Sequence, residues 1–434
     1  MNKNVKSSIY PPRFWPALII FSLTGQVAWV VENMYFNVFI YKMFQASAEE
    51  ISLMVAASAV MATLTTVLIG ALSDKIGKRK IFICGGYILW GISILCFAFI
   101  RADVIAALFG GAASVAATGV TLVIVMDCVM TFFGSSANDA CFNAWLTDAT
   151  EKGGRGAAEG VNAMMPLIAI LVVFGGFMSF DLNRAESWVS IYLIIGITVM
   201  IIGLLGLVLI AETGVKKEEN QDYWGNILYG FRPTVVKANP TLYLTLFGFV
   251  IFNIAIQVFM PYLILYYDVS LGLDNYVIIM APAIILAAVV TVFAGKYYDK
   301  VGFYRSVIPS LGLLMAGFVI LFFFKQTLLV FIGSLLMMSG YLSGMAVFGA
   351  MIRERIPAGK AGMFQGLRIF AQVLIPGVIG PYIGALVLRG AEKIVNDDGT
   401  TSFVPNANVF LAALVVAVIL MILIVWKKNA FKEK

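Results

Sequence analysis

The sequence predicts an all-α membrane protein with about twelve transmembrane helices in two pseudo-symmetric six-helix bundles. Of its 434 residues, 61% are hydrophobic and only 12% are charged, whereas roughly a quarter of the residues in a soluble domain are charged. The mean hydropathy is +0.94, because apolar stretches follow one another with short polar loops between them. Most stretches reach the about 20 residues that a helical crossing needs. The lipid bilayer is therefore the expected solvent and partner.

A helix-length criterion divides the chain into consecutive apolar spans. The expected spans are 14–41, 51–72, 81–100, 119–146, 157–180, 188–211, 241–267, 276–298, 306–324, 328–352, 361–388 and 409–426. The stretch 104–118 is apolar but short and rich in Gly and Ala. We assign it to an outer loop or a re-entrant segment.

Lys and Arg are concentrated in alternate loops, and this asymmetry marks the cytoplasmic side of a membrane protein. We therefore expect both termini in the cytoplasm and the chain in the cell membrane. The first apolar run is too long for the h-region of a signal peptide, which indicates an uncleaved first helix. The formal charge of +6 is spread over separate loops and forms no basic patch of the kind that binds nucleic acid.

The chain divides into two related halves, 1–211 and 241–434, joined by a charged cytoplasmic connector at 212–240. A spaced pattern occurs once in each half. Its two copies are Gly70-x-x-x-Asp74-x-x-Gly77-x-x-Lys80 and Gly295-x-x-x-Asp299-x-x-Gly302-x-x-Arg305. Each copy follows the second span of its half, which predicts a parallel repeat related by an axis along the membrane normal.

The segment Gly70-Ala-Leu-Ser-Asp74-Lys-Ile-Gly77-Lys-Arg79-Lys80 resembles the loop between helices two and three of the major facilitator superfamily. The resemblance covers essentially the whole chain and implies the two-bundle fold of a secondary transporter. In that family the loop is a cytoplasmic latch, so the resemblance gives gating roles to Asp74 and Arg79, and to Asp299 and Arg305 in the second copy. The alternative is a solvated group of charges that only determines topology.

Two carboxylates in the spans are the expected cation-coupling residues. Glu32 in the first span and Asp127 in the fourth lie at similar depth, where an ionisable group costs at least about 2.5 kcal/mol on insertion scales. Their positions resemble those of the glycoside–pentoside–hexuronide:cation symporter branch, in which carboxylates on these helices hold sugar and cation. The second span has no acidic residue, so the paired carboxylates of a sodium site are missing and protons are favoured.

Amide and aromatic side chains form stripes that suit a polyhydroxylated solute, because amides both donate and accept hydrogen bonds while rings cover apolar sugar faces. The expected solute-binding residues are Gln26, Trp29, Asn33, Asn37, Thr131, Asn253, Gln257 and Gln372. For any one of them the alternative is a hydrogen bond that only joins two helices. Asp139 and Arg368 are the remaining gating candidates, although Arg368 lies close enough to the inner surface to snorkel.

These features together predict a secondary active transporter that couples a cation, which we expect to be a proton, to symport of a small polar solute such as a sugar or glycoside. The chain has no histidine and no Walker-type phosphate loop, so histidine relays and direct ATP drive are excluded. We expect no enzymatic activity, no metal site and no cofactor. Two alternatives stay open: proton-driven efflux of amphipathic compounds, and a non-transporting sensor on the same scaffold.

Overall fold

The computed structural model describes residues 13–109, 112–150, 155–212, 229–273, 275–357, 361–396 and 400–431. Contacts divide the chain into two compact units. Unit 1 comprises Met1–Glu32, Leu64–Leu108 and Val125–Gln221, and unit 2 comprises Asn33–Thr63, Phe109–Ile124 and Asp222–Lys434. The predicted boundaries at 211 and 241 are not tested by this division, because unit 2 includes the adjoining ends of the first two spans and the beginning of the fourth.

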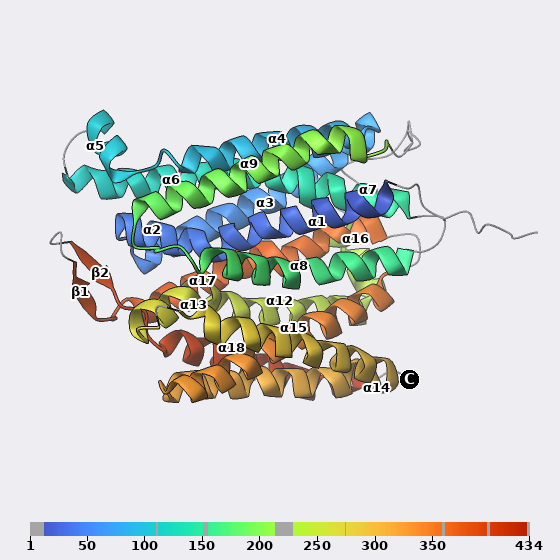
Figure 1. Ribbon diagram of the computed structural model, residues 1–434. Helices are drawn as coiled ribbons and strands as arrows, with labels where there is room; N and C mark the ends of the chain where they lie inside the picture. Colours follow the sequence, from blue (N-terminus) through green and yellow to red (C-terminus); the bar gives the residue numbers. More distant parts are fainter. Residues whose placement is uncertain are drawn as a thin grey trace, which may run out of the picture. The chain divides into compact units, whose positions relative to one another are not determined.

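The first half of the chain folds into helices with few breaks (Figure 1). They are α1 (Phe14–Val30), η1 (Val31–Tyr35), α2 (Phe36–Phe44), α3 (Ala48–Ile76), α4 (Arg79–Phe97), α5 (Ala102–Phe109), α6 (Ala112–Gly134), η2 (Ser135–Phe142), α7 (Asn143–Ala149), α8 (Arg155–Phe177) and α9 (Ala185–Leu209). In unit 1, α4 packs against α9 and η2, and α1 packs against α8 and α9.

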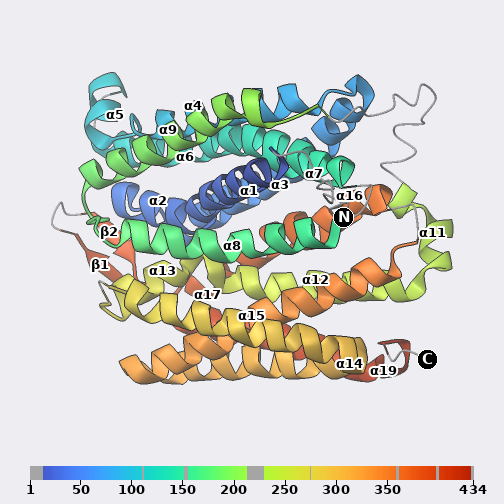
Figure 2. The same cartoon turned by 45° about the vertical axis from the view of Figure 1, so that its right-hand side comes forward.

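The second half is also helical, apart from one hairpin (Figure 2). Its elements are η3 (Tyr229–Phe231), α11 (Pro233–Ala238), α12 (Pro240–Phe259), η4 (Met260–Tyr262), α13 (Leu263–Leu265), η5 (Tyr266–Ser270), α14 (Val277–Phe323), α15 (Thr327–Arg355), α16 (Ala361–Ile369), η6 (Phe370–Leu374), α17 (Ile375–Leu388), α18 (Asn408–Trp426) and α19 (Lys428–Phe431). The short strands β1 (Lys393–Val395) and β2 (Thr401–Phe403) pair antiparallel.

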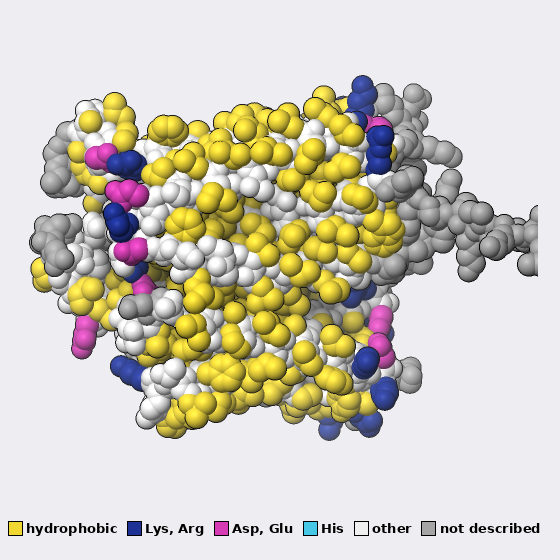
Figure 3. Space-filling view, in the orientation of Figure 1, with side chains coloured by type: hydrophobic (Ala, Val, Ile, Leu, Met, Phe, Trp, Pro, Cys, Tyr) yellow, Lys and Arg dark blue, Asp and Glu magenta, His cyan; other side chains and the backbone are white. Residues whose placement is uncertain are grey.

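Among the described residues, eleven helical segments are long and apolar enough to cross a membrane. One of them, α14, is 47 residues long and contains a non-helical residue at Gly302. It therefore supplies two of the expected spans, and the prediction of about twelve spans is confirmed. On the visible faces in Figure 3, hydrophobic side chains cover the middle lengths of the helices, while acidic and basic side chains lie near the helix ends.

The second glycine of each copy of the repeated pattern has a positive φ. Gly77 has φ 72° and Gly302 has φ 76°, a left-handed region that favours glycine because a Cβ would clash there. Each glycine reverses the chain between two spans of its half. The repeat detected in the sequence thus corresponds to the same turn in both halves.

The expected outer loop or re-entrant segment at 104–118 is wrong in part. Its first residues belong to α5, and its last residues are the opening turns of α6, so the fourth span begins earlier than predicted. Gly and Ala are less hydrophobic than Leu, Ile or Val, so a segment rich in them stands out less in a hydropathy profile. It can still be helical, since Ala is the best helix former. The sequence interpretation took the Gly- and Ala-rich start of this helix for a loop.

Close helix pairs are held by glycines at which no Cβ fits. A Cβ on Gly91 of α4 would lie 2.6 Å from the carbonyl oxygen of Gly196 in α9, and one on Gly340 of α15 would lie 2.3 Å from the backbone nitrogen of Leu314 in α14. Small residues are the usual contact between transmembrane helices, since dispersion forces replace the hydrophobic effect in lipid.

Candidate functional site

Four spans contain π-helical segments, and these segments carry polar residues. η1 holds Glu32 and Asn33, η2 holds Asn138 and Asp139, η5 holds Asp268, and η6 holds Gln372. A π-helical turn leaves backbone groups without their usual partners and is often kept at functional sites. Four of the residues that the sequence singled out, Glu32, Asn33, Asp139 and Gln372, thus lie where the described helices depart from regular α geometry.

The two predicted coupling carboxylates are buried in unit 1. Glu32 is 7% exposed and Asp127 is 2% exposed. Thr131, one helical turn after Asp127, donates a hydrogen bond of 2.9 Å from its hydroxyl to Oε1 of Glu32. Tyr192 of α9 and Cys128 lie within electrostatic range of Asp127, and Cys128 also lies within range of Glu32. A single hydroxyl therefore joins the first and fourth spans at their acidic residues.

Asp139 lies in a second polar group further along the same span. Ser135 donates a hydrogen bond of 3.1 Å to Oδ2 of Asp139, and the side-chain amide of Asn138 donates one of 3.2 Å to Oδ1. Oδ1 of Asn138 accepts from the hydroxyl of Tyr87 at 3.0 Å. This carboxylate is therefore held by neutral donors inside the bundle. Its predicted place in a gate stays a prediction.

Aromatic rings border this second group. The rings of Trp29 and Trp90 lie 5.0 Å apart between centroids, and Tyr87 meets Trp90 edge-on at 5.5 Å. Trp90 is fully buried, yet its indole nitrogen has no hydrogen-bond acceptor among the described residues. Sequence reasoning identified Trp29 but missed Tyr87 and Trp90, which lie in a span without any acidic residue to draw attention to it.

Gly25 lets α1 approach this group closely. A Cβ at this position would lie 2.4 Å from Oδ1 of Asn138 and 2.8 Å from the hydroxyl of Tyr87. We expect Gly25→Ala to displace Asn138 and to lower the free energy of unfolding by about 1–3 kcal/mol, the usual cost of overpacking. Urea titration of the purified protein, followed by tryptophan fluorescence, measures this loss. Gly85→Ala is the control, because a Cβ at Gly85 has nothing within 4 Å.

Two of the predicted amide residues of unit 2 donate hydrogen bonds to their own helices. The side-chain nitrogen of Asn253 donates to the carbonyl of Phe249 at 2.8 Å, and that of Asn37 donates to the carbonyl of Asn33 at 2.9 Å. Oδ1 of Asn37 is buried without a partner among the described residues, so it remains able to accept a hydrogen bond. Asn33 is exposed, whereas Gln257, Arg368 and Gln372 are half-buried. Gln26 is likewise half-buried in unit 1.

The glycines of α17 have a packing role. A Cβ on Gly380 would lie 2.4 Å from Cβ of Gln257, and one on Gly384 would lie 2.4 Å from the carbonyl oxygen of Val258. On another face, a Cβ on Gly377 would lie 2.5 Å from Cβ of Ala59 in α3. These glycines thus allow α17 to pack closely on α12 and α3 within unit 2.

The first copy of the repeated pattern forms a charge network at one end of unit 1. Arg79 is almost fully buried and forms ion pairs with Asp74 and, at 3.1 Å, with Asp148 at the end of α7. It also donates a hydrogen bond of 2.5 Å to the hydroxyl of Ser73. Asp74 itself is 60% exposed. The arginine therefore links the α3–α4 turn to the end of the fourth span.

The second copy has different partners. Asp299 and Arg305 are both exposed, and no ion pair joins them within the described part of the chain. Instead, the hydroxyl of Tyr298 donates to Oε2 of Glu354, near the end of α15, at 2.8 Å. In both halves, a residue near the turn between the second and third spans is therefore bonded to the end of the fourth, by a buried arginine in the first half and by a tyrosine in the second. Gating by Asp299 and Arg305 stays a prediction that no contact supports.

Three polar contacts within unit 2 escaped the sequence interpretation. Lys42 at the end of α2 forms an ion pair with Asp268 of η5. The hydroxyl of Tyr276 donates to that of Tyr35 at 2.9 Å, and both tyrosines are buried. Lys42 and Asp268 end the first and seventh spans, which are equivalent in a six-helix repeat. Their opposite charges at equivalent positions could have predicted this ion pair from the sequence.

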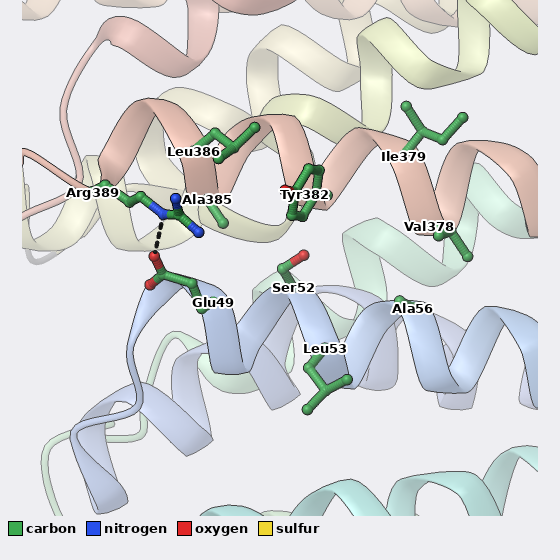
Figure 4. Close-up of a pocket in the computed structure, with 10 residues that line it drawn as sticks. All are labelled: Glu49, Ser52, Leu53, Ala56, Val378, Ile379, Tyr382, Ala385, Leu386 and Arg389. Atoms are coloured by element: carbon green, nitrogen blue, oxygen red, sulfur yellow. Dashed lines mark hydrogen bonds and ion pairs between the residues drawn. The ribbon is translucent and has the colours of Figure 1, made fainter.

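The third contact lies at one end of a pocket between α3 and α17 (Figure 4). Nε of Arg389 donates to Oε1 of Glu49 at 3.0 Å. The cavity has a volume of about 360 Å³. Its remaining lining is mainly apolar and consists of Ser52, Leu53, Ala56, Val378, Ile379, Tyr382, Ala385 and Leu386. Ser52 supplies the one hydroxyl on the α3 side.

Comparison with solved structures gives several similar folds. The nucleoside transporter NupG has a TM-score of 0.69 at 12% identity and covers 98% of this chain and 100% of its own. A D-xylose-proton symporter has a TM-score of 0.71 at 14% identity, with 97% and 98% of the two chains covered. A bacterial homologue of the human lysosomal transporter Spinster, solved in an inward-facing unoccupied conformation, has a TM-score of 0.68 at 14% identity, with 98% and 99% covered.

Comparison at the level of sequence gives the family. No curated protein sequence matches the chain significantly. A family model for the Major Facilitator Superfamily matches residues 14–381, which include both copies of the repeated pattern. The resemblance found in that pattern and the predicted fold class are thereby confirmed. The chain belongs to the major facilitator superfamily and is a multi-pass membrane transporter, not an enzyme.

Proposed function

We propose that the protein is a proton-coupled symporter that moves a small polar solute, such as a sugar or glycoside, by alternating access. One observation carries the proposal: Glu32 and Asp127 are buried in transmembrane segments of unit 1, with the Thr131 hydroxyl bonded to Glu32 at 2.9 Å. Ionisable residues at such depth are expensive and normally belong to an ion or proton pathway. Coupling gives a reason for two carboxylates at this depth.

A proton suits this pair better than a sodium ion. A buried carboxylate is costly while it is charged, and one proton removes that charge without further ligands. A metal cation instead needs several oxygen ligands around it. Thr131 uses its hydroxyl proton on Glu32, so its hydroxyl stabilises the negative charge in the state before the proton arrives. The second span offers no additional carboxylate.

The proposed solute class follows from the aromatic and amide groups in unit 1. The rings of Trp29 and Trp90 lie against each other, and the buried indole N–H of Trp90 is available to donate a hydrogen bond to a solute. Rings with a few donors and acceptors beside them suit the apolar faces and hydroxyls of a sugar. Solved transporters of similar fold include one for nucleosides and one for D-xylose with protons. Nucleosides contain a pentose and D-xylose is one, so the probes include a nucleoside and a pentose.

The proposed orientation places both termini in the cytoplasm and the protein in the cell membrane. It follows from the concentration of Lys and Arg in alternate loops. The Arg79 network would then lie at the cytoplasmic end of unit 1, and the Lys42–Asp268 pair would lie at the outer end of unit 2.

Substitution of the two carboxylates tests the proposal. A melting-shift screen with D-xylose, D-glucose, methyl glucosides and uridine first identifies a solute that stabilises the purified protein. In proteoliposomes, an imposed pH gradient is expected to drive accumulation of that solute by the native protein. We expect Glu32→Gln and Asp127→Asn each to lower this accumulation about tenfold or more, within the range of linkage between two bound ligands. Solute binding is retained in both variants.

Asp103→Asn is the matched control, because Asp103 is an exposed carboxylate paired with Arg101 outside the spans. It leaves accumulation unchanged. The proposal is overturned if the two substitutions in the spans also leave accumulation unchanged. Increased sensitivity of cells to lipophilic cations in the same variants would favour efflux, and a stabilising solute without any transport would favour a sensor.

A further inference from the structure

The fourth span carries a regular series of polar residues between its two acidic positions. Asp127, Thr131, Ser135 and Asp139 follow one another at intervals of four. All four are in unit 1, and all but Asp139 are buried. Two of the members are carboxylic acids at the ends of the series, and the two between them are hydroxyls. None of the four positions carries an apolar side chain.

Helix geometry explains how the series stays on one side of the span. In an α-helix, residues four apart lie on one face but advance slightly around it, because a turn has 3.6 residues. The span changes to π-helical geometry at Ser135, where a turn contains more residues and the advance is reversed. The π-helical segment η2 thus brings Asp139 back towards the line that Asp127 and Thr131 begin.

Both hydroxyls of the series donate a hydrogen bond to a carboxylate. Thr131 donates to Glu32 at 2.9 Å, which joins the α1–η1 carboxylate to the series. Ser135 donates to Oδ2 of Asp139 at 3.1 Å. The neighbouring hydroxyl of Ser136, by contrast, donates to the carbonyl of Phe132 in its own helix at 2.6 Å. Of the three adjacent hydroxyls Thr131, Ser135 and Ser136, the two at the four-residue interval therefore donate to a carboxylate, and Ser136 does not.

The ionisable groups that face the series are few. Tyr192 of α9 and Cys128 lie within electrostatic range of Asp127, and Tyr87 of α4 lies within range of Asp139. Glu32 faces the series from η1. Towards the end of the span, Arg79 and its partners Asp74 and Asp148 form the charge network that borders water. Asp139 lies about 13 Å along the helix from Asp148, at 1.5 Å per residue.

We propose that Asp139, Ser135 and Thr131 form a proton path between the Arg79 end of unit 1 and the coupling carboxylates Glu32 and Asp127. This inference deepens the proposed symport and depends on it for its physiological role. Asp139 is the carboxylate that exchanges protons with water, and the two hydroxyls pass them along the span. Asp139, expected from sequence to serve a gate, acquires a role in coupling.

The proton balance of each transfer is simple. An incoming proton binds the Asp139 carboxylate, and the Ser135 hydroxyl, which until then donates to Oδ2 of Asp139, turns away from it. Asp139 then gives its proton to the Ser135 oxygen as Ser135 releases its own proton to a bridging water, which passes one proton on to Thr131. Thr131 accepts that proton and releases its own to Glu32 or Asp127. Each hydroxyl begins and ends with one proton. Successive hydroxyls are about 6 Å apart along the axis, so one bridging water completes the step between them.

Time-resolved infrared spectroscopy after a pH jump tests the path with the proton itself as probe. The carboxyl signal of Glu32 and Asp127 is identified as the one lost in Glu32→Gln combined with Asp127→Asn. We expect its rise to slow about tenfold or more in Ser135→Ala, Thr131→Val and Asp139→Asn. Ser136→Ala is the matched control and keeps the native rate, and Ser135→Thr restores the hydroxyl and the rate. Equal rates in Ser135→Ala and Ser136→Ala would overturn the path.

A flux measurement separates this inference from the proposed function. In proteoliposomes, Ser135→Ala and Asp139→Asn are expected to keep equilibrium exchange of labelled solute but to lose accumulation driven by a pH gradient. A native protein that accumulates no solute under a pH gradient contradicts the symport proposal, while the infrared rates still report on the path. Native coupling together with unchanged accumulation in both variants contradicts the path alone.

Discussion

Replacement of Arg79 by methionine is expected to lower the free energy of unfolding by about 3 kcal/mol, the lower end of the range for breaking a buried ion pair. The side chain of Arg79 is 5% exposed, and its loss leaves Asp74 and Asp148 facing each other without a cation. The loss also removes the donor to Ser73. Because Asp74 is 60% exposed, water compensates part of the cost. Urea titration of the purified protein measures the change.

The second copy of the pattern supplies the control. Arg305→Met removes an exposed arginine without an ion pair in the described residues, and its effect is expected within about 0.5 kcal/mol of zero. A combined Arg79→Met, Asp74→Asn and Asp148→Asn variant is expected to recover much of the loss, since removing a whole buried network costs less than breaking it. Equal effects of Arg79→Met and Arg305→Met would contradict a structural role for the network.

Asymmetry between the two copies marks the limit of what a repeated pattern can predict. The pattern required the same turn, and Gly77 and Gly302 both adopt it. The partners of the charged residues depend on the ends of α7 and α15, which lie far away in sequence. At the end of α7, Asp148 forms an ion pair with Arg79. At the end of α15, Glu354 accepts a hydrogen bond from Tyr298.

The fold was largely predictable because a bilayer imposes a simple rule. Every backbone polar group in lipid must be bonded within its own helix, so hydropathy and length alone give the spans. An error arose where hydropathy has little contrast, at the start of α6. The separate spans on the two sides of the turn at Gly302 were predicted correctly, although the structure runs them together as one long helix, α14.

The ionisable members of the candidate site were the clearest in the sequence. Glu32 and Asp127 stand out because charge is rare at membrane depth, and both are buried. Their neutral partners are of types common in such helices, so Thr131 was expected to bind solute and not to donate to Glu32, and Ser135 was not singled out. The π-helical segments that align them depend on packing and leave no simple trace in composition.

The ion pair between Lys42 and Asp268 carries the last prediction. The two side chains are 12% and 18% exposed, so removal of the lysine leaves a largely buried carboxylate without its cation. We expect Lys42→Met to weaken the contact between α2 and η5 by about 3 kcal/mol or more. The combined Lys42→Asp and Asp268→Lys variant reverses the pair and is expected to recover most of that loss.

Accessibility of a buried position reports whether this contact holds its segment closed. Asn37 lies within α2 and is fully buried, so Asn37→Cys, in a background with Cys84, Cys96, Cys128 and Cys141 replaced, is shielded from an impermeant maleimide. Loss of the ion pair is expected to raise its labelling rate about tenfold or more, because a few kcal/mol shifts a two-state equilibrium by that factor. Arg389→Met breaks the exposed Glu49 pair and is expected to cost less than about 1 kcal/mol. If it raised the labelling rate as much as Lys42→Met, the buried pair would have no special part in closing the segment.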